Sequence, residues 1–509
     1  MYDVIILGSG IGGLVCASRL ARNNKKVLLF EKNYHIGGTS HVFKRNGYLF
    51  PMGPLSFSYP ELITDLLHKI GIDRKIEFTR NHFQLIAPEI DIIYSLPLNN
   101  LKEKLKRIFK EEKKGIDLFI NEMEEIITLI KDIHTWHPDY FIGNKKREAI
   151  NKLNQSKKNI IERIKIFSQS SSKSLIEKYI SNEILQNLFG SQGTYKPKMS
   201  VKLLANMWYL MSEKGIWFPS CGIHGINQMI YGAILKNKGE VKLSTPVTEI
   251  LIENNRAIGV KTSKNEVFNS KWIISNIDYK NTFLKLINPK QIPPDFLNNL
   301  KNWSITESEL CIFLGVKRKN IDLSKIKAQH VFYRKEIKVK AQYDPEDFEN
   351  EEIEICLWSE NFPESAPPDR LTLVLRVNLP FDHISKWWLG EKKRKNGYIE
   401  YKKGLANKII KIVEDILPGL SASIEIMEIA TPLTYQDWGN RYHGTFAGWS
   451  WNSKDIEKLT EKLLIITPIN NLLMVGIYAT SELFLGGYPT SIFTANSACD
   501  LILEESLNV

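Results

Sequence analysis

The first forty residues constrain the fold more than any other part of the chain. The run Asp3–Leu7 has the largely apolar character of a buried parallel strand, and a glycine-rich turn follows it. Next come a predicted helix, Val15–Asn23, and a second strand, Lys26–Phe30, which ends at Glu31. A strand, a glycine turn, a helix and a second strand that ends in an acid are typical of a βαβ unit that binds a dinucleotide.

The glycines of this turn have separate expected tasks. Gly8 permits the sharp turn out of the strand, Gly10 lets backbone N–H groups approach a pyrophosphate, and a glycine at position 12 or 13 lets the helix pack closely on the sheet. The helix start directs its partial positive charge at the phosphates, and the acid accepts hydrogen bonds from the adenosine ribose. A glycine-rich turn that binds nothing is the alternative, but it leaves the spacing of the acid without a reason. The predicted contact residues of this unit are Gly8, Gly10, Ile11, Gly12, Gly13 and Glu31.

A second glycine pair indicates which dinucleotide is bound. Gly37-Gly38 closely follows the acid, and flavoproteins of the glutathione-reductase-like class carry such a pair beside the pyrophosphate. The segment from residue 31 to residue 39 resembles theirs, which favours FAD over NAD. The segment adds Lys32, Gly37, Gly38 and Thr39 to the predicted cofactor contacts.

The composition fits a globular protein of several domains. The chain has 509 residues, of which 43% are hydrophobic and 25% are charged, and this length predicts about two to four domain-sized units. The net charge of +11 could attract nucleic acid or anionic lipid. Lysine is abundant along the whole chain, however, and no nucleic-acid-binding motif accompanies it, so we expect no nucleic-acid partner.

The cysteines and the hydropathy of the chain indicate in which cellular compartment the protein is expected. Five scattered cysteines without C-x-x-C spacing predict a reducing, cytoplasmic setting with no disulfide framework and no metal site. The apolar run Val4–Ala21 contains Arg19 and several glycines, so a nucleotide-binding turn explains it better than a signal peptide or a membrane span. No other run approaches the roughly 18 apolar residues of a spanning helix. We therefore expect a soluble or peripherally attached protein.

Two basic segments could contact lipid. Leu101–Lys110 places apolar residues among lysines as a basic amphipathic helix does, and Trp387-Trp388 precedes a run of basic residues. Acidic residues interleave with the lysines of the first segment, and the tryptophans can pack on their own domain. The favoured interpretation is a solvated helix and a packed loop, with membrane contact as the alternative.

The order of the predicted elements divides the chain into interleaved parts. Strand-like and glycine-rich patterns predict an FAD-binding domain formed by residues 1–98, 215–279 and 431–509. Helical periodicity over 99–214 predicts the helical part of a substrate domain, and strands with one long helix over 280–430 predict its α+β part. The predicted fold class is α/β, with a Rossmann-like FAD-binding domain interrupted by an α+β substrate domain that carries a helical insertion.

Two later segments are candidates for further cofactor contacts. Val247, in a predicted strand, is the candidate to place its backbone amide against the adenine edge, and an ordinary core strand residue is the alternative. Near the C-terminus a glycine pair precedes a helix whose first turn can hold Pro489. Such a helix start can lie against the pyrimidine side of a flavin and stabilise the negative charge that builds there on reduction, whereas an ordinary glycine-proline helix start is the alternative. The predicted residues here are Gly487, Tyr488, Pro489 and Thr490.

Taken together, these segments resemble the phytoene desaturase, carotenoid isomerase and retinol saturase family of flavoproteins, particularly carotenoid-isomerase-like members over Lys214–Leu286. The resemblance covers nearly the whole chain, including Ala430–Gly448 and Gly476–Ala498. It implies a glutathione-reductase-2-like fold, one non-covalent FAD, a long apolar tunnel for an isoprenoid chain, and peripheral attachment to a membrane. The matched segments add Asn276 and Gly476 to the predicted cofactor contacts.

Two positions depart from the family pattern. Ile477 follows the glycine of the last strand, where members often have an aspartate that helps to hold FAD. After the turn at Gly47, where members have an aspartate, this chain has Phe50-Pro51-Met52-Gly53. These departures predict weaker contacts to FAD.

The favoured function is an FAD-dependent oxidoreductase that desaturates, saturates or isomerises C–C or C=C bonds of a hydrophobic isoprenoid or polyene. Such a substrate offers no charge to recognise, so an apolar pocket is expected, and no acid–base pair stands out. Tyr195, Tyr435 and His443 could line the tunnel, although packed aromatic rings and a hydrogen-bonded histidine are the favoured interpretation. The alternatives are an amine-oxidase-like flavoenzyme and a non-catalytic prenyl-binding protein, as in GDP-dissociation inhibitors. The exact substrate, the direction of the reaction, the electron acceptor and the oligomeric state stay open.

Overall fold

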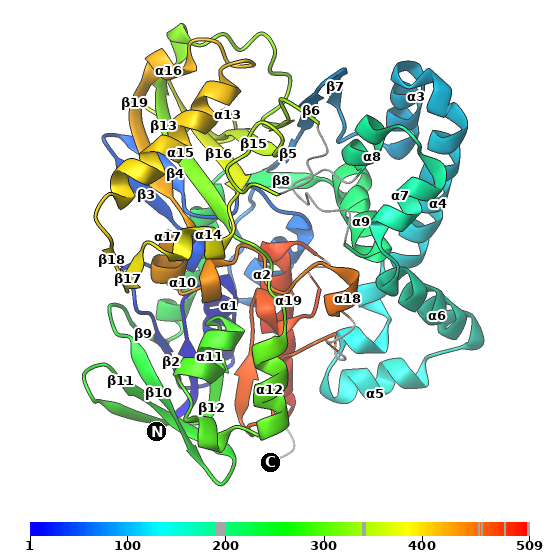
Figure 1. The fold of residues 1–509 in the computed structure, drawn as a ribbon. Coiled ribbons are helices and arrows are strands. Elements are labelled where there is room, and N and C mark those ends of the chain that lie inside the picture. Colours follow the sequence, from blue (N-terminus) through cyan, green and yellow to red (C-terminus); the bar gives the residue numbers. More distant parts are fainter. Residues whose placement is uncertain (190–198, 338–342, 457–458, 460–461, 483–484, 506–509) are drawn as a thin grey trace.

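The computed structural model describes residues 1–189, 199–337, 343–456, 459, 462–482 and 485–505. Two large sheets occupy the left of Figure 1, one above the other, and a group of helices lies at the right. No helix formed by the described residues is both long and apolar enough to cross a membrane.

The lower sheet contains the predicted βαβ unit. Its order is β10-β11-β12-β1-β2-β9, and β20 also pairs with β12. β1 lies between β2 and β12 and is parallel to both, so its apolar residues are buried on both faces. The strands are β1 (Tyr2–Leu7), β2 (Val27–Phe30), β9 (Glu240–Lys242), β10 (Val247–Glu253), β11 (Arg256–Thr262), β12 (Val267–Ser275) and β20 (Leu472–Met474).

Three helices pack together beside this sheet. The first helix, α1 (Ile11–Arg22), contacts both α10 (Gly222–Lys236) and the last helix, α19 (Gly487–Glu505). Ten of the twelve residues of α1 are buried, as expected for a helix between a sheet and two other helices. The predicted late helix is confirmed, and it begins at Gly487, which puts Pro489 in its first turn.

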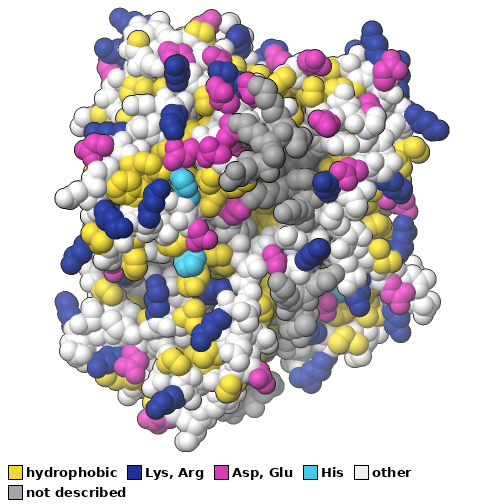
Figure 2. Space-filling view, in the orientation of Figure 1, with side chains coloured by type: hydrophobic (Ala, Val, Ile, Leu, Met, Phe, Trp, Pro, Cys, Tyr) yellow, Lys and Arg dark blue, Asp and Glu magenta, His cyan; other side chains and the backbone are white. Residues whose placement is uncertain are grey.

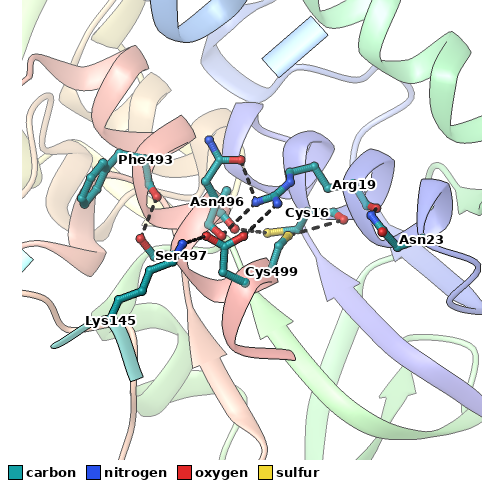
Figure 3. A network of polar contacts seen from close by, with 10 residues as sticks. Cys16, Arg19, Asn23, Lys145, Phe493, Asn496, Ser497 and Cys499 are labelled. Carbon is teal, nitrogen blue, oxygen red and sulfur yellow. Dashed lines mark hydrogen bonds and ion pairs between the residues drawn. The ribbon is translucent and has the colours of Figure 1, made fainter. Parts of the chain in front are cut away.

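Polar contacts join α1 to α19 (Figure 3). Arg19 of α1 donates to the backbone oxygen and to Oδ1 of Asn496, both at 3.0 Å, and its Nη2 lies 2.8 Å from Oδ1 of Asp500. Lys145 of a third helix reaches Oδ2 of the same aspartate at 2.5 Å. These contacts fix the first and last helices to each other, so that their N-terminal ends serve one site.

The upper sheet has seven strands in the order β19-β13-β16-β15-β14-β6-β7. Its outer face packs on α15 (Tyr398–Val413), and its inner face is turned toward the lower sheet. The strands predicted over 280–430 are confirmed, since all of them lie in this sheet. Its members are β6 (Phe83–Ala87), β7 (Ile90–Ile93), β13 (Glu309–Lys317), β14 (His330–Tyr333), β15 (Ile353–Leu357), β16 (Arg370–Asn378) and β19 (Ile424–Ala430).

One part of the predicted domain division differs from the sheet pairing. Residues 1–98 are predicted to belong to the FAD-binding domain, but β6 pairs in parallel with β14, with His330 opposite Phe83. The β6–β7 hairpin therefore extends the upper sheet. The other parts of the domain division stay a proposal.

Residues 99–189 and 199–214 form helices, as predicted. The apolar side of α3, including Leu101 and Leu105, is buried inside this helical part, which confirms that the basic helix packs on its own domain. A single π-helical turn, Leu210–Lys214, ends this part. The helices are α3 (Leu98–Ile108), α4 (Lys113–Ile130), α5 (Gly143–Asn151), α6 (Gln155–Gln169), α7 (Ser172–Tyr179), α8 (Glu183–Phe189) and α9 (Val201–Tyr209).

Shorter elements connect these parts. Trp387 stacks on Tyr401 at 5.0 Å, as the packed-loop interpretation predicts, whereas the side chain of Trp388 is 44% exposed. The connecting strands are β3 (Val42–Arg45), β4 (Tyr48–Pro51), β5 (Phe78–Asn81), β8 (Ile216–Pro219), β17 (Trp388–Gly390) and β18 (Lys393–Arg394). The connecting helices are α2 (Pro60–Lys69), α11 (Tyr279–Lys285), α12 (Pro294–Asn302), α13 (Trp358–Asn361), α14 (Phe381–Ser385), α16 (Leu420–Ser423), α17 (Pro432–Gly439) and α18 (Ser453–Ile456).

Candidate functional site

A cavity of about 1170 Å³ is lined by residues of both sheets. It begins where β1 and β2 end, which is the position at which ligands bind to open parallel sheets. Its volume exceeds the range of about 300–1,000 Å³ that is usual for a single drug-sized ligand. The cavity therefore has room for a large ligand or for two ligands together.

The glycine turn after β1 forms one end of this cavity. Gly8 has a φ of +89°, a conformation that favours glycine. A Cβ on Gly13 would lie 2.0 Å from the carbonyl oxygen of Gly8, so the close packing of α1 on the strand depends on Gly13. Gly10 is the N-cap of α1 and lines the cavity.

The side chain of Asn276 lies among three glycines. A Cβ on Gly10 would lie 2.7 Å from its Nδ2, and Cβ atoms on Gly12 and Gly476 would lie 2.5 Å and 2.8 Å from its Oδ1. Gly12 thus makes room for this amide, whereas Gly13 makes room for the strand. Asn276 itself lines the cavity.

The acid at the end of β2 is held in place by neighbouring donors. Glu31 is buried, and its Oε2 accepts hydrogen bonds from the backbone N–H and the hydroxyl of Ser9, at 2.8 Å and 2.7 Å. Its Oε1 accepts from the backbone N–H of Asn33 at 2.9 Å. A carboxylate offers about four lone-pair sites, so Glu31 can still accept a hydrogen bond from a ligand in the cavity.

The second glycine pair lies beside the first. Gly37 and Gly38 have φ values of +95° and +55°, and a Cβ on Gly38 would lie 3.2 Å from Cα of Gly10. A Cβ on Gly37 would lie 2.7 Å from Nδ2 of Asn227, whose Oδ1 accepts a 2.9 Å hydrogen bond from the hydroxyl of Tyr488. Through Asn227 the second glycine pair is connected to the first turn of α19.

Nearly all of the predicted cofactor residues border the same cavity. The exceptions are three residues that do not line it, namely Gly12, Gly13 and Thr490. The residues that line it are Gly8, Gly10, Ile11, Glu31, Lys32, Gly37, Gly38, Thr39, Val247, Asn276, Gly476, Gly487, Tyr488 and Pro489. Their direct contacts with a cofactor stay a prediction.

The departures from the family pattern also lie at this cavity. Ile477, Met52 and Gly53 all line it. The predicted tunnel residues Tyr435 and His443 line it too, and the ring of His443 stacks on Phe381 at 4.4 Å. The prediction for Tyr195 lies outside the described residues.

The far part of the cavity has an apolar wall. It lies between the inner face of the upper sheet and the end of α9, which the predicted apolar tunnel requires. The wall residues are Phe83, Met207, Leu210, Met211, Ile216 and Phe332.

The inner face of the upper sheet carries a cluster of charged groups that was not predicted from the sequence. Glu309 and Arg376 line the cavity beside the hydroxyl of Tyr435, and Glu354 and His330 lie behind them. Burial favours a lower pKa for the guanidinium, but the two carboxylates outweigh it and raise the pKa of Arg376. The pKa of Glu354 is lowered, because the hydrogen bond with His330 and the charge of Arg376 outweigh its burial.

These features fit a flavin dinucleotide. Four glycines bring backbone close to the cavity, two helix N-termini direct partial positive charge toward it, and the buried carboxylate of Glu31 suits a ribose. The remaining apolar part of the cavity can hold a second, hydrophobic molecule.

Comparisons with known proteins agree with this assignment. A family model for flavin-containing amine oxidoreductases matches residues 11–503. The chain is 24% identical over 516 residues to the 1-hydroxycarotenoid 3,4-desaturase of Flavobacterium sp. (strain P99-3), with 99% of both chains covered. It is 25% identical over 502 residues to the chloroplastic prolycopene isomerase of Daucus carota, covering 94% of this chain and 76% of the relative. It is 25% identical over 558 residues to the all-trans-retinol 13,14-reductase of Danio rerio, covering 100% of this chain and 87% of the relative.

A solved structure supports the fold. An oxidoreductase from Methanosarcina mazei aligns with a TM-score of 0.64 over 98% of this chain and 100% of its own, at 15% identity. The predicted fold class and the predicted FAD cofactor are confirmed by these findings. The chain belongs to the flavin-containing amine oxidoreductase family and is an FAD-dependent oxidoreductase.

Proposed function

We propose that this enzyme desaturates, saturates or isomerises the carbon chain of a hydrophobic isoprenoid or polyene. The observation that carries the proposal is the continuity of the cavity, which extends from the dinucleotide residues to the apolar wall between α9 and the upper sheet. Relatives named for carotenoid and retinol chemistry, which match nearly the whole chain, support the same substrate class.

In this proposal, different residues of the chain bind the cofactor and the substrate. Bound FAD supplies two-electron chemistry when a carbon chain lies against it. The glycines and Glu31 hold the dinucleotide, and the apolar wall binds the carbon chain by excluding water. Met207 and Met211 are flexible side chains that can adapt to a long, irregular ligand.

We expect the purified protein to be yellow and to convert one of three polyenes. Prolycopene, a 1-hydroxycarotenoid and all-trans-retinol would be incubated separately with the oxidised and the dithionite-reduced protein, and the products separated by chromatography. Conversion only with reduced flavin and without net oxidation identifies an isomerase, whereas a change in hydrogen content identifies a desaturase or a saturase. A heat-denatured sample serves as the control.

The rival functions give different results. An amine oxidase would leave all three polyenes unchanged and release hydrogen peroxide from amines. A prenyl-binding protein without catalysis would be colourless and would release its ligand unaltered. Either result contradicts the proposal.

We further propose that the protein is cytoplasmic and attaches peripherally to an anionic membrane through α5 and α6. Residues 143–169 contain eight basic and two acidic side chains, a net charge of +6. Ile150 and Ile166 are 50% and 60% exposed among these charges. Figure 2 shows exposed Lys and Arg side chains along the edge formed by the helical part of the chain. Exposed apolar side chains within a basic surface suit a membrane interface.

Charge reversal of this surface is expected to weaken vesicle binding. The triple variant Arg147→Glu, Lys158→Glu, Lys165→Glu should bind vesicles of anionic lipid at least about tenfold more weakly in a sedimentation assay, since each basic residue contributes about 1 kcal/mol near such a surface. The control reverses three exposed lysines elsewhere, Lys238, Lys264 and Lys290. Equal weakening by both triple variants would contradict a specific role for α5 and α6.

A further inference from the structure

We propose that Glu309 is a catalytic carboxylate of this cavity, which stabilises positive charge on the bound carbon chain and exchanges a proton with it. Tyr435 and Arg376 act as positioning residues for that carboxylate. The identity of the carbon chain rests on the proposed function, whereas the assignment of the negative charge rests on the contacts of the cluster.

Glu309 is fixed through one of its two oxygens. It is the first residue of β13, its side chain is 14% exposed, and it lines the cavity. The hydroxyl of Tyr435 donates to its Oε1 at 2.7 Å. Among the described residues no hydrogen-bond donor reaches Oε2, so this oxygen is available to a ligand.

Arg376 is shared between two carboxylates. Its Nε lies 3.8 Å from Oε1 of Glu309, and its Nη1 lies 3.7 Å from Oε2 of Glu354. The guanidinium also donates to the backbone oxygen of Gly53, which lies on the cofactor side of the cavity. One guanidinium cannot neutralise two carboxylates, so the cluster carries one negative charge when His330 is neutral.

Cross-strand register produces this arrangement. Arg376 lies on β16, directly opposite Cys311 of β13 on one side and Glu354 of β15 on the other. Glu309 is two residues before Cys311 and therefore on the same face of the sheet. All four side chains belong to the inner face, so the negative charge is directed at the cavity and not at solvent.

A net negative charge is costly to bury and therefore calls for a reason. The apolar wall adjoins this cluster, since Phe83 of the wall stacks on His330 at 4.7 Å. Beside apolar side chains a fixed charge acts strongly on an opposite charge that develops nearby. A polyene has no charge in its ground state, but removal of hydride from it, or addition of a proton to it, leaves positive charge on carbon. A carboxylate held by a tyrosine and an arginine is preorganised to stabilise that charge.

Desaturation releases a proton, and we assign Oε2 of Glu309 as its acceptor. When a CH–CH unit becomes C=C, one C–H bond would break with its electron pair leaving as hydride, which bound FAD would accept as the two-electron oxidant. The other C–H bond breaks as a proton that moves to Oε2 of Glu309, and its electron pair becomes the new C=C bond. In the saturating direction Glu309 returns that proton to carbon, and bound reduced FAD would supply the hydride.

A binding experiment tests the charge without turnover. Geranylgeranyl-trimethylammonium and neutral geranylgeraniol would be titrated into the FAD-loaded protein below their critical micelle concentrations, with tryptophan fluorescence as the readout. The wild type should bind the cation at least about tenfold more tightly, equivalent to about 1.4 kcal/mol. Glu309→Gln should bind both probes equally. Equal binding by the wild type, or an unchanged preference in the variant, would overturn the proposal.

A matched control lies on the neighbouring strand. Glu428 of β19 pairs with Arg45, is well exposed and does not line the cavity. Glu428→Gln removes the same charge from the same sheet and should keep the full preference for the cation. Flavin absorbance and the unfolding temperature of each variant show that it is folded and loaded.

Turnover adds a second test. With a polyene that the wild type converts, Glu309→Gln should lower kcat about 100-fold with little change in KM, as loss of a proton-transfer group does. Glu309→Ala should regain activity with added formate, which a purely structural defect would not allow. Tyr435→Phe should lower kcat less than Glu309→Gln, because it releases the carboxylate without removing it.

The outcomes separate the two proposals. If the wild type converts no polyene but its preference for the cation disappears in Glu309→Gln, the proposed function fails and the charge assignment stands. If a polyene is converted equally well by Glu309→Gln, the proposed function stands and the catalytic role of Glu309 is overturned.

Discussion

Replacement of Gly13 by alanine is expected to give a protein that no longer retains FAD and that unfolds at a lower temperature. The added Cβ would lie 2.0 Å from the carbonyl oxygen of Gly8 and 3.2 Å from its carbonyl carbon. Both atoms are backbone, so α1 must move away from β1. Overpacking of this kind costs about 1–3 kcal/mol, and more where the backbone has to shift. A displaced helix start no longer directs its N–H groups at the cofactor. Flavin absorbance per protein after desalting and a thermal melt measure both effects.

The control is another glycine-to-alanine change in a neighbouring helix. Gly232 lies in α10, which packs on α1, and a Cβ there would meet no heavy atom within 4 Å. Gly232→Ala should retain all of its flavin, and the lower entropy of the unfolded chain stabilises it by about 0.4–1 kcal/mol. If Gly13→Ala kept a full complement of flavin at an unchanged unfolding temperature, the close approach of α1 to β1 would not anchor the cofactor.

The sequence was sufficient for parts of the fold that depend on neighbouring residues. The strand before Gly8, the helix after it and the acid at Glu31 form one contiguous pattern, and the structure contains all of them. The helix begins at Ile11, four residues before the predicted start at Val15, because the glycines at positions 12 and 13 belong to its first turn. The pairing of strands was harder to predict from the sequence. Residues 75–98 have the pattern of strands, but the partner of the strand Phe83–Ala87 is His330–Tyr333, far along the chain. Alternation of polar and apolar residues shows which face is buried, not which strand lies beside it.

The same contrast applies to the site. The cofactor residues come in short runs with fixed spacing, whereas the charged cluster is assembled from separate strands of the upper sheet. A signal for it does exist in the sequence, because Arg376 interrupts an apolar run, between Leu375 and Val377, in the middle of a strand. A charge at such a position needs a partner on an adjacent strand. Only the register of β16 with β15 identifies that partner as Glu354.

A second buried charge network joins the helical part to the segment that leads into α19. Oε2 of Glu482 lies 2.6 Å from Nζ of Lys202 on α9, and its Oε1 lies 2.5 Å from Nζ of Lys462. Lys202 also donates to the hydroxyl of Tyr140 at 3.0 Å. The side chains of Lys202 and Glu482 are only 5% and 4% exposed. Because α9 supplies part of the apolar wall, this network fixes the position of the wall relative to the cofactor end of the cavity.

Glu482→Gln is therefore expected to destabilise the protein strongly. It leaves two ammonium groups near each other without a counter-charge, and breaking a buried pair in this way costs about 3–5 kcal/mol. The exposed carboxylate Glu148, which lies 3.9 Å from Lys152, provides the control. Glu148→Gln should change the stability by no more than about 0.5 kcal/mol. Denaturant melts of both variants and of the wild type at neutral pH measure the difference.

The pH dependence gives this prediction a second, independent readout. Burial alone would raise the pKa of Glu482, but Lys202 and Lys462 outweigh it and hold the pKa far below its usual value. A lowered carboxylate pKa contributes stability that is fully present above the pKa of the unfolded chain, about 4.3, and is lost as the pH falls toward the folded-state value. The advantage of the wild type over Glu482→Gln should therefore begin to fall near pH 4 and shrink progressively as the pH is lowered further. A difference that stays constant from neutral pH into this acidic range would mean that the variant fails through packing and not through charge.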